Sequence, residues 1–238
     1  MQLFYNPDID ETTETFSFDK EESKHIIKVL RKKDSDILHV TNGLGLLFET
    51  QITLASDNKC IVEVLSIKKA DEPKFRLHLA VAPTKMNDRF EWFLEKATEI
   101  GIQEITPIFC DRSERKVINK ERFEKIILSA MKQSNETFLP KLNDAISFKE
   151  FVKQKNEGLQ LIAHCEETDK KSLKEVLKPN ENVTLLIGPE GDFSDKEIAL
   201  ALENNFQPVA LGNTRLRTET AAIVACHSVV FFNEITNK

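Results

Sequence analysis

From Leu77 onward, the sequence alternates between short apolar segments typical of strands and longer segments with the apolar spacing of amphipathic helices. The expected strands are Leu77–Ala82, Ile105–Phe109, Leu159–Cys165, Val183–Ile187 and Val209–Leu211. The expected helices begin near Asn87, Asn119, Ser172, Asp195 and Thr218. Strands that alternate with helices pair in parallel, with the helices covering the faces of the sheet. This part of the chain is therefore predicted to be an α/β domain with a mostly parallel sheet.

The first 70 residues have a different pattern, with short strand-like segments and tight turns. Asp19 with Glu22 has the spacing of a capping box, which predicts one short helix. The strand-like segments that follow are Ile37–Val40, Leu46–Leu54 and Cys60–Ile67. Short strands with one helix predict a small β-barrel over residues 1–70. The charged segment Lys68–Lys74 is expected to join it to a second domain over residues 74–238.

Length and composition exclude several classes of protein. The 238 residues, 40% of them hydrophobic and 30% charged, suffice for a soluble protein with a substantial core. No apolar run approaches the ~18–20 residues that cross a bilayer, and no basic region followed by an apolar one marks a secretory signal. The four cysteines lie far apart, so neither disulfides nor a bound metal are expected. A cytoplasmic location fits this cysteine usage best.

The net charge of −6 argues against a protein that simply coats nucleic acid. A local basic patch can still attract RNA, and the segment from Lys24 to Lys33 contains basic residues without any acidic one. The candidates for contact with RNA phosphates are Lys28, Arg31, Lys32 and Lys33. A solvated basic turn would have the same composition, so both interpretations stay open.

The seven glycines of the chain are few, so their positions carry information. Gly188 and Gly191 directly follow the apolar segment Thr184–Ile187, and Gly212 directly follows Val209–Leu211. Both places are carboxyl ends of expected strands, where open α/β sheets bind ligands and small residues let a ligand approach the backbone. Neither loop has the spacing of a dinucleotide-binding or phosphate-binding loop. Tight turns without a ligand would explain the same glycines.

The segment Leu211–Ala221 places two arginines and a glutamate at the start of an apolar helix. Thr218 can cap this helix, and Glu219 in its first turn suits the helix dipole, so capping alone would explain that glutamate. Arg217 opposes the dipole and needs another partner, which favours a functional role.

Together these segments resemble the late motifs of the RsmE family of ribosomal RNA uridine-N3 methyltransferases, within the SPOUT superfamily. Those motifs run approximately Ile-Gly-Pro-Glu-Gly-Gly-Phe-Ser and Leu-Gly-x-Arg-Ile-Leu-Arg-Thr-Glu-Thr-Ala. This chain has Ile187–Ser194 and Leu211–Ala221 at those places. Earlier blocks resemble the family in the same order, because His25–Arg31 fits a His-x-x-x-Val-Leu-Arg signature and Lys96–Gly101 precedes Pro107. The resemblance spans nearly the whole chain.

Three positions depart from the family pattern. Asp192 replaces the second glycine of the first motif, and Arg215 stands one place later than the family's first arginine. Glu136 occupies a place where the family often has an arginine. If that arginine contacts RNA in relatives, Arg112 is a candidate to supply the charge here, together with Arg115.

The resemblance implies a small PUA-like β-barrel followed by a SPOUT methyltransferase domain, which is α/β with a parallel sheet and a C-terminal trefoil knot. It implies S-adenosylmethionine as the cofactor, no metal, and a homodimer as the assembly. The residues that it assigns to the cofactor are Ile187, Gly188, Pro189, Glu190, Gly191, Leu211, Gly212, Leu216, Arg217 and Thr218.

The implied reaction moves a methyl group to N3 of a uridine in the 16S ribosomal RNA of the small ribosomal subunit. N3 of uracil is protonated at neutral pH, so a cation must stabilise the negative charge that forms when this proton leaves. Arg217 is the candidate for that role, and Glu219 could receive the proton or orient Arg217. The RNA contacts are expected at the basic patch and at Arg112. Two other functions stay open, namely 2′-O-ribose methylation of RNA and a non-catalytic RNA-binding factor for ribosome assembly.

Overall fold

The computed structural model describes residues 1–155, 157–166 and 170–236, which divide into two compact units. The first unit consists of Met1–Glu72 and Met131–Leu139. The second unit consists of Pro73–Ala130 and Pro140–Lys238. Residues 156, 167–169 and 237–238, which fall within the second domain expected from the sequence, lie outside the described residues.

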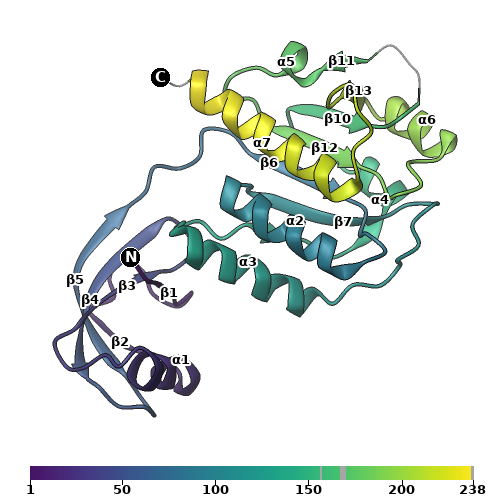
Figure 1. Ribbon diagram of the computed structural model, residues 1–238. Coiled ribbons are helices and arrows are strands. Elements are labelled where there is room, and N and C mark those ends of the chain that lie inside the picture. Colours follow the sequence, from purple (N-terminus) through teal and green to yellow (C-terminus); the bar gives the residue numbers. More distant parts are fainter. Residues whose placement is uncertain (156, 167–169, 237–238) are drawn as a thin grey trace. The chain divides into compact units, whose positions relative to one another are not determined.

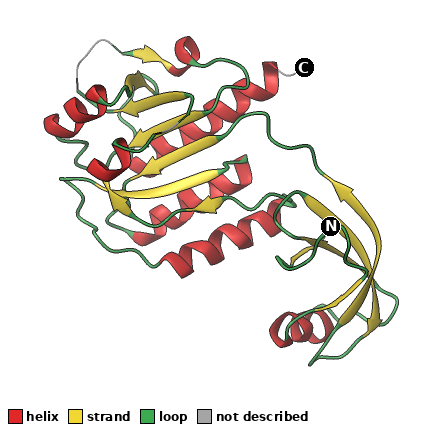
Figure 2. Ribbon diagram, turned by 180° about the vertical axis from the view of Figure 1, so that it is seen from behind, coloured by secondary structure: helices red, strands yellow, loops and turns green. Residues whose placement is uncertain are grey.

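The first unit is built on a curled sheet of five strands in the order β1-β3-β4-β5-β2 (Figure 2). The strands are β1 (Leu3–Tyr5), β2 (Thr15–Ser17), β3 (Ile37–Thr41), β4 (Leu46–Leu54) and β5 (Ile61–Lys69). β1 pairs with β3 in parallel, and the other neighbours are antiparallel. The core includes Phe4, Leu38, Val40, Phe48, Ile52 and Val62. The three expected strands are confirmed with small shifts at their ends, whereas the three-residue strands β1 and β2 have no alternating pattern that predicts them.

The helix that Asp19 predicts is short and continues into a π-helical turn. Helix α1 spans Lys20–Lys24, and the Asp19 carboxylate accepts a hydrogen bond from the Glu22 N–H group at 2.7 Å. The π-helical turn η1 spans His25–Val29. Arg31 follows with a φ of 56°, a left-handed conformation, so the helical conformation does not continue into the basic residues that follow.

Gly45 makes room in the first unit for a segment from much further along the chain. The Gly45 N–H group donates to Thr137 O at 3.0 Å, and the Thr41 hydroxyl donates to the same carbonyl at 3.1 Å. A side chain at Gly45 would collide with the Phe138 ring, so only glycine fits there. Met131–Leu139 therefore completes the first unit, a contact that local sequence patterns do not reveal.

The second unit contains an eight-stranded sheet in which the described pairings are all parallel (Figure 1). Seven strands follow the order β11-β13-β10-β12-β6-β7-β8, and β9 pairs with β7. The strands are β6 (Leu77–Val81), β7 (Glu104–Phe109), β8 (Lys141–Leu142), β9 (Ile146–Ser147), β10 (Leu159–Ala163), β11 (Lys171–Ser172), β12 (Val183–Ile187) and β13 (Gln207–Ala210). The mostly parallel α/β fold predicted from the alternation is confirmed.

The helices cover both faces of this sheet, with α2 and α7 packed together on one face and α4 and α6 on the other (Figures 1 and 2). The helices are α2 (Asn87–Ile100), α3 (Lys120–Ser134), α4 (Phe148–Val152), α5 (Leu173–Val176), α6 (Asp195–Glu203) and α7 (Thr218–Thr236). No helix in the described ranges is long and apolar enough to span a membrane.

Local sequence signals explain where several helices begin and end. At α6, the Ser194 hydroxyl accepts from Glu197 N–H at 3.3 Å, and the Glu197 carboxylate accepts from Ser194 N–H at 2.8 Å. Gly101 ends α2 with a φ of 100°. The expected helix starts are confirmed, and α4 is an additional helix whose capping box begins at Ser147.

A core of aromatic and aliphatic side chains lies between the sheet and the α4–α6 layer. Phe148, Phe151 and Phe206 pack there against sheet residues such as Leu186. Phe193 joins the same core and is 1% exposed, although it belongs to the loop that follows β12. Burial of this ring anchors that loop to the body of the domain.

A buried polar network lies near the amino ends of β6 and β7. His78 Nε2 lies 2.7 Å from Thr106 Oγ1, and Asn143 Nδ2 donates to that same oxygen at 2.8 Å. Asn143 also donates to Glu104 Oε1 at 2.7 Å. Burial lowers the pKa of His78 to about 4, because removal from water costs more for the charged imidazolium than for the neutral ring.

The buried His78 predicts a loss of stability in mildly acidic solution. Its folded-state pKa of about 4 lies below the ordinary value of 6.5, so unfolding takes up a proton between these pH values. The stabilising contribution of neutral His78 is complete above pH 6.5 and is lost as the pH falls towards 4. Between about pH 7 and about pH 4.5, the His78→Gln variant should lose less unfolding free energy than the wild type, by roughly 1–3 kcal/mol. Urea titrations at both pH values measure this difference, and equal losses would contradict it.

Candidate functional site

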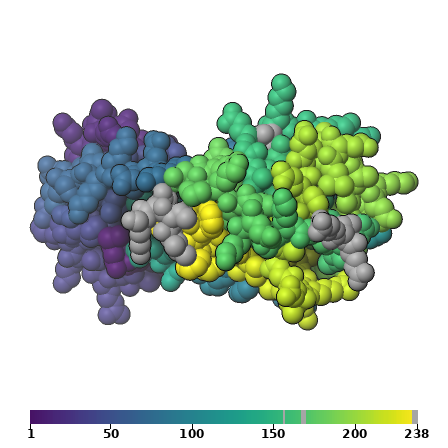
Figure 3. All heavy atoms as spheres, turned by 90° about the horizontal axis from the view of Figure 1, so that it is seen from above, coloured from purple at the N-terminus to yellow at the C-terminus, as the bar shows by residue number. Residues whose placement is uncertain are grey.

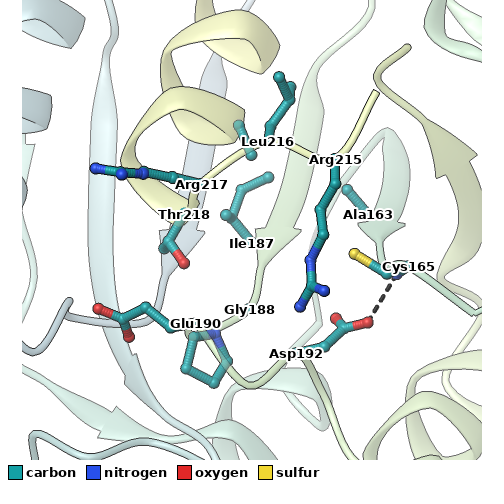
Figure 4. A pocket seen from close by; sticks show the side chains of 12 residues that line it. Ala163, Cys165, Ile187, Gly188, Glu190, Asp192, Arg215, Leu216, Arg217 and Thr218 are labelled. Atoms are coloured by element: carbon teal, nitrogen blue, oxygen red, sulfur yellow. Dashed lines mark hydrogen bonds between the residues drawn. The ribbon is translucent and has the colours of Figure 1, made fainter. Parts of the chain in front are cut away.

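A pocket lies at the carboxyl ends of the neighbouring strands β10 and β12, beside the start of α7 (Figure 4). Its volume is about 270 Å³. The lining residues are Ala163, Cys165, Ile187, Gly188, Pro189, Glu190, Asp192, Arg215, Leu216, Arg217, Thr218 and Ala221. Figure 3 shows in yellow-green that the segment with α6 and the loop before α7 reaches the surface of this unit. The pocket therefore occupies the edge of the sheet at which open α/β folds bind ligands.

Seven of the ten residues expected to hold a cofactor line this pocket, namely Ile187, Gly188, Pro189, Glu190, Leu216, Arg217 and Thr218. Gly191, Leu211 and Gly212 do not line it. Of the other five lining residues, Asp192, Arg215 and Ala221 lie within the two motif segments without having been assigned to the cofactor, and Ala163 and Cys165 lie outside those segments. Ala163 and Cys165 follow from the position of β10 beside β12, and strand order has no local signal in the sequence.

Close packing by Phe193 and Arg112 accounts for the two glycines of the loop after β12. A Cβ atom on Gly188 would lie 3.1 Å from two ring atoms of Phe193. A Cβ atom on Gly191 would lie 3.3 Å from the Cβ atom of Arg112. The sequence pattern suggested that small residues admit a ligand here, but these close approaches are made by the protein's own side chains.

Asp192, which departs from the family's glycine, occupies a left-handed conformation with a φ of 62°. Glycine adopts such a conformation most easily, and aspartate tolerates it better than most residues. One carboxylate oxygen of Asp192 accepts from Cys165 N–H at 2.7 Å, and the other accepts from Phe193 N–H at 2.8 Å. The side chain thus ties the loop after β12 to the end of β10.

Arg112, an expected RNA contact, lies on the loop after β7 and holds the loop after β12. Its Nη1 atom donates to Gly191 O at 3.1 Å and to Phe193 O at 3.0 Å. Its Nη2 atom lies 3.7 Å from an oxygen of Asp195. These contacts engage much of the guanidinium within the protein, and a contact with RNA stays a prediction.

Arg115, on the same loop after β7, holds the loop that follows β6. Its Nε atom donates to Thr84 O at 3.2 Å, and Nη2 donates to Lys85 O at 2.9 Å. Lys85 N–H in turn donates to the Glu190 carboxylate at 2.8 Å. The loop after β7 therefore supports two loops, those after β6 and β12, and a hydrogen bond links those two to each other.

Arg217 and Glu219, the expected catalytic residues, have different surroundings. Arg217 lines the pocket and is exposed, and its guanidinium makes no hydrogen bond or ion pair with the residues that the structure describes. Glu219 is 7% exposed and does not line the pocket. Its Oε1 atom lies 3.8 Å from Arg89 Nε on α2, and its Oε2 atom has no partner among the described residues.

The expected RNA-binding patch lies in the first unit. Lys28 Nζ lies 2.5 Å from an oxygen of Asp57, and this cation lowers the pKa of the Asp57 carboxyl. Arg31 and Lys33 are exposed, and Lys32 is half-buried. Arg31 and Lys33 form no side-chain ion pair within the described ranges, so both charges face solvent.

The class of this protein follows from its fold, its pocket and two family profiles. The profile of a family described as RNA methyltransferase domain matches residues 71–230. A second profile, described as RNA methyltransferase PUA domain, matches residues 18–65. The chain is therefore an RNA methyltransferase with an N-terminal PUA domain.

The particular family follows from its relatives. The ribosomal RNA small subunit methyltransferase E of Rickettsia conorii is 34% identical over 86% of this chain and 85% of its own length. This chain belongs to the ribosomal RNA small subunit methyltransferase E family, RsmE, as its motifs indicated.

Two solved structures extend the likeness to the fold. The crystal structure of a probable rRNA-methyltransferase from Porphyromonas gingivalis has a TM-score of 0.91 at 37% identity and covers 100% of both chains. A Legionella pneumophila protein described as a putative methyltransferase, solved in complex with S-adenosylmethionine, has a TM-score of 0.84 at 31% identity over 96% of each chain. The expected SPOUT-type α/β domain with an N-terminal PUA domain is confirmed.

The contacts of Arg112 predict that the loop after β12 depends on one side chain. Arg112→Ala removes both hydrogen bonds to Gly191 O and Phe193 O, so amide hydrogen exchange at Phe193 should rise severalfold. The free energy of unfolding should fall by about 1 kcal/mol. Arg122→Ala is the matched control, because it removes an exposed guanidinium that pairs with Glu91 instead. The same exchange rate at Phe193 in both variants would show that Arg112 does not hold the loop.

Proposed function

We propose that this protein transfers a methyl group from S-adenosylmethionine to a base of 16S ribosomal RNA in the small ribosomal subunit. One observation carries the proposal. The segments Ile187–Ser194 and Leu211–Ala221, which match the family motifs, come together to line most of one pocket. The names of the relatives support the RNA substrate, and the cofactor in the Legionella pneumophila structure supports the methyl donor.

The pocket has surfaces that fit such a cofactor. Ile187, Leu216 and Ala221 provide an apolar wall for an aromatic base, and charged side chains lie on either side of it. Its volume of about 270 Å³ is close to the lower end of the range for small-molecule sites, roughly 300–1,000 Å³. The residues proposed to hold the cofactor are Ile187, Gly188, Pro189, Glu190, Leu216, Arg217 and Thr218 in the pocket, with Gly191, Leu211 and Gly212 in the adjoining loops.

When bound, the cofactor supplies a methyl group activated by a positively charged sulfur. The acceptor in our proposal is N3 of a uridine, which must lose its proton and leave negative charge on the uracil carbonyl oxygens. Arg217 carries a guanidinium at the pocket without a partner among the described residues, and it can stabilise that charge electrostatically. We therefore keep Arg217 as the proposed catalytic cation.

Glu219 is the proposed proton acceptor. Its Oε2 atom has no partner within the described ranges, which leaves it able to accept a proton or a hydrogen bond. The cation beside its other oxygen is Arg89, at 3.8 Å. That pairing disfavours the other role suggested for Glu219, which was to orient Arg217.

The C-terminal part of the chain is proposed to form the trefoil knot of the family, and the protein is proposed to be a cytoplasmic homodimer. Exposed aromatic groups on two packed helices support the dimer. Trp92 on α2 is 44% exposed, and Phe231 on α7 is 50% exposed with the His227 ring stacked against it. Such groups commonly lie in interfaces between subunits.

Methyl transfer to isolated small ribosomal subunits that lack the modification tests the function. With isotopically labelled S-adenosylmethionine, label should enter 16S RNA, and mass spectrometry of the nucleosides should find it on N3 of uridine. Label on a ribose 2′ oxygen would replace the proposal with the alternative 2′-O activity. Absence of cofactor binding in calorimetry would favour a non-catalytic assembly factor.

The proposed role of Arg217 predicts a split between rate and cofactor affinity. Arg217→Ala should lower the single-turnover rate of methyl transfer by roughly 10²–10³-fold, because one group that stabilises the developing charge is lost. Cofactor affinity should change by a small factor, and Arg217→Lys should recover part of the rate because it keeps the charge. A rate close to that of the wild type in Arg217→Ala would exclude this role.

The proposed RNA-binding patch comprises Lys28, Arg31, Lys32 and Lys33, and it predicts a change in salt dependence. The Arg31→Ala, Lys33→Ala double variant should lose two phosphate contacts, which reduces the slope of log K against log salt by about 1.4–1.8. A Lys153→Ala, Lys155→Ala double variant removes two exposed charges from the second unit and serves as the control. Equal slopes in both variants would show that Arg31 and Lys33 do not contact RNA phosphates.

A further inference from the structure

Two side chains of opposite charge face each other at one end of the pocket. The guanidinium of Arg215 and the carboxylate of Asp192 both line the cavity, and Figure 4 shows them extending towards one another. They form no ion pair within 4.0 Å in the part of the chain that the structure describes. They also occupy two of the positions at which this chain departs from the RsmE pattern. Two opposite charges that line one cavity without pairing can each bind a group of a ligand.

The carboxylate of Asp192 is held in place before any ligand arrives. Hydrogen bonds from Cys165 N–H at 2.7 Å and Phe193 N–H at 2.8 Å fix its two oxygens. A carboxylate can accept about four hydrogen bonds, so these two leave capacity for a further donor. An ammonium group of a ligand is a donor that suits both this capacity and the negative charge.

Arg215 supplies the complementary charge. Its side chain is exposed and makes no hydrogen bond or ion pair with the described residues. Figure 4 shows it directed towards Asp192, whereas Arg217 extends away from this pair. The two arginines of the segment before α7 are therefore available to two different groups.

Asp192 and Arg215 both affect the pKa of Cys165, which lies at the same end of the pocket. Burial raises the pKa of the Cys165 thiol, Asp192 adds to this rise, and Arg215 opposes it. Both charged groups are thus within electrostatic reach of one sulfur atom that lines the pocket.

We propose that Asp192 and Arg215 form a subsite for the amino-acid end of the cofactor, with Asp192 binding its α-ammonium and Arg215 its α-carboxylate. The inference rests on the proposed function, because it assigns part of the proposed ligand to part of the same pocket. An α-amino acid carries its ammonium and its carboxylate on the same carbon atom, so it can bridge two side chains that do not pair directly. Arg215 can bind a carboxylate through two parallel hydrogen bonds.

Two thioether ligands distinguish binding at this subsite from binding in the rest of the pocket. S-adenosylhomocysteine carries the amino-acid end, and 5′-methylthioadenosine has the same base, ribose and sulfur without it. Arg215→Ala and Asp192→Asn should each lower the affinity for S-adenosylhomocysteine about tenfold, since each removes one charge-assisted contact. Both variants should bind 5′-methylthioadenosine within about twofold of the wild type.

The variants are chosen to preserve the fold. Asparagine tolerates the left-handed backbone of residue 192, and its one oxygen can keep one of the two hydrogen bonds from Cys165 N–H and Phe193 N–H. Arg215 has no hydrogen bond or ion pair to lose among the described residues. Arg122→Ala is the matched control, because it removes an exposed guanidinium that pairs with Glu91 outside the pocket and should leave the ratio of the two affinities unchanged. Calorimetric titrations of the wild type and the three variants measure these ratios.

The outcomes distinguish the subsite from the proposed function. A wild type that binds neither ligand would overturn the proposed function and this inference with it. A wild type that binds both ligands, with variants that weaken both equally or neither, would overturn the subsite alone. Selective loss of S-adenosylhomocysteine binding in both variants, with an unchanged ratio in Arg122→Ala, would support the subsite.

Discussion

The parallel pairing of β10 with β12 is the interaction on which the pocket depends. Ala163 lies opposite Ile187 in this ladder, so the chain leaves both strands at the same edge of the sheet. The loop after β12 can then reach the end of β10, where Asp192 accepts a hydrogen bond from Cys165 N–H. The segment before α7 closes the remaining side with Leu216. One register of strand pairing thus brings three distant segments around a single cavity.

Contacts behind the pocket explain how its loop keeps a defined shape while its charged side chains stay available. Phe193 is buried in the core below the loop, and Arg112 donates to two carbonyl groups of the same loop. Gly188 and Gly191 allow these two groups to approach the backbone closely. Phe193 and Arg112 support the loop without lining the cavity, whereas Asp192 both ties the loop to the end of β10 and faces the cavity. Most of the support of the loop therefore does not depend on the side chains that a ligand would contact.

Elements with local causes could be predicted from the sequence, and features with long-range causes could not. Helix α6 begins where the Ser194 capping box predicts, because capping involves residues only three apart. The motifs likewise located most of the pocket. The place of Cys165 in the pocket could not be predicted, because it depends on which strand lies beside β12. The contact of Phe138 with Gly45 could not be predicted either, because the two residues are far apart in the sequence. The positive φ of Asp192 explains why the family has a glycine at that position. The hydrogen bonds of its carboxylate to Cys165 N–H and Phe193 N–H could not be predicted from the residue type alone.

The charges around the pocket divide into those that stabilise the fold and those left for ligands. Arg112 and Arg115 donate to backbone carbonyls, and Arg89 lies beside Glu219. Arg215 and Arg217 have no such contacts within the described ranges, although the chain has 39 acidic residues against 33 basic ones. A shortage of carboxylates therefore cannot explain why these two arginines are unpaired, since Asp192 and Glu190 line the same pocket. Their separation keeps both signs of charge available, which suits a ligand with an ammonium and a carboxylate and an acceptor base that becomes negative as it reacts.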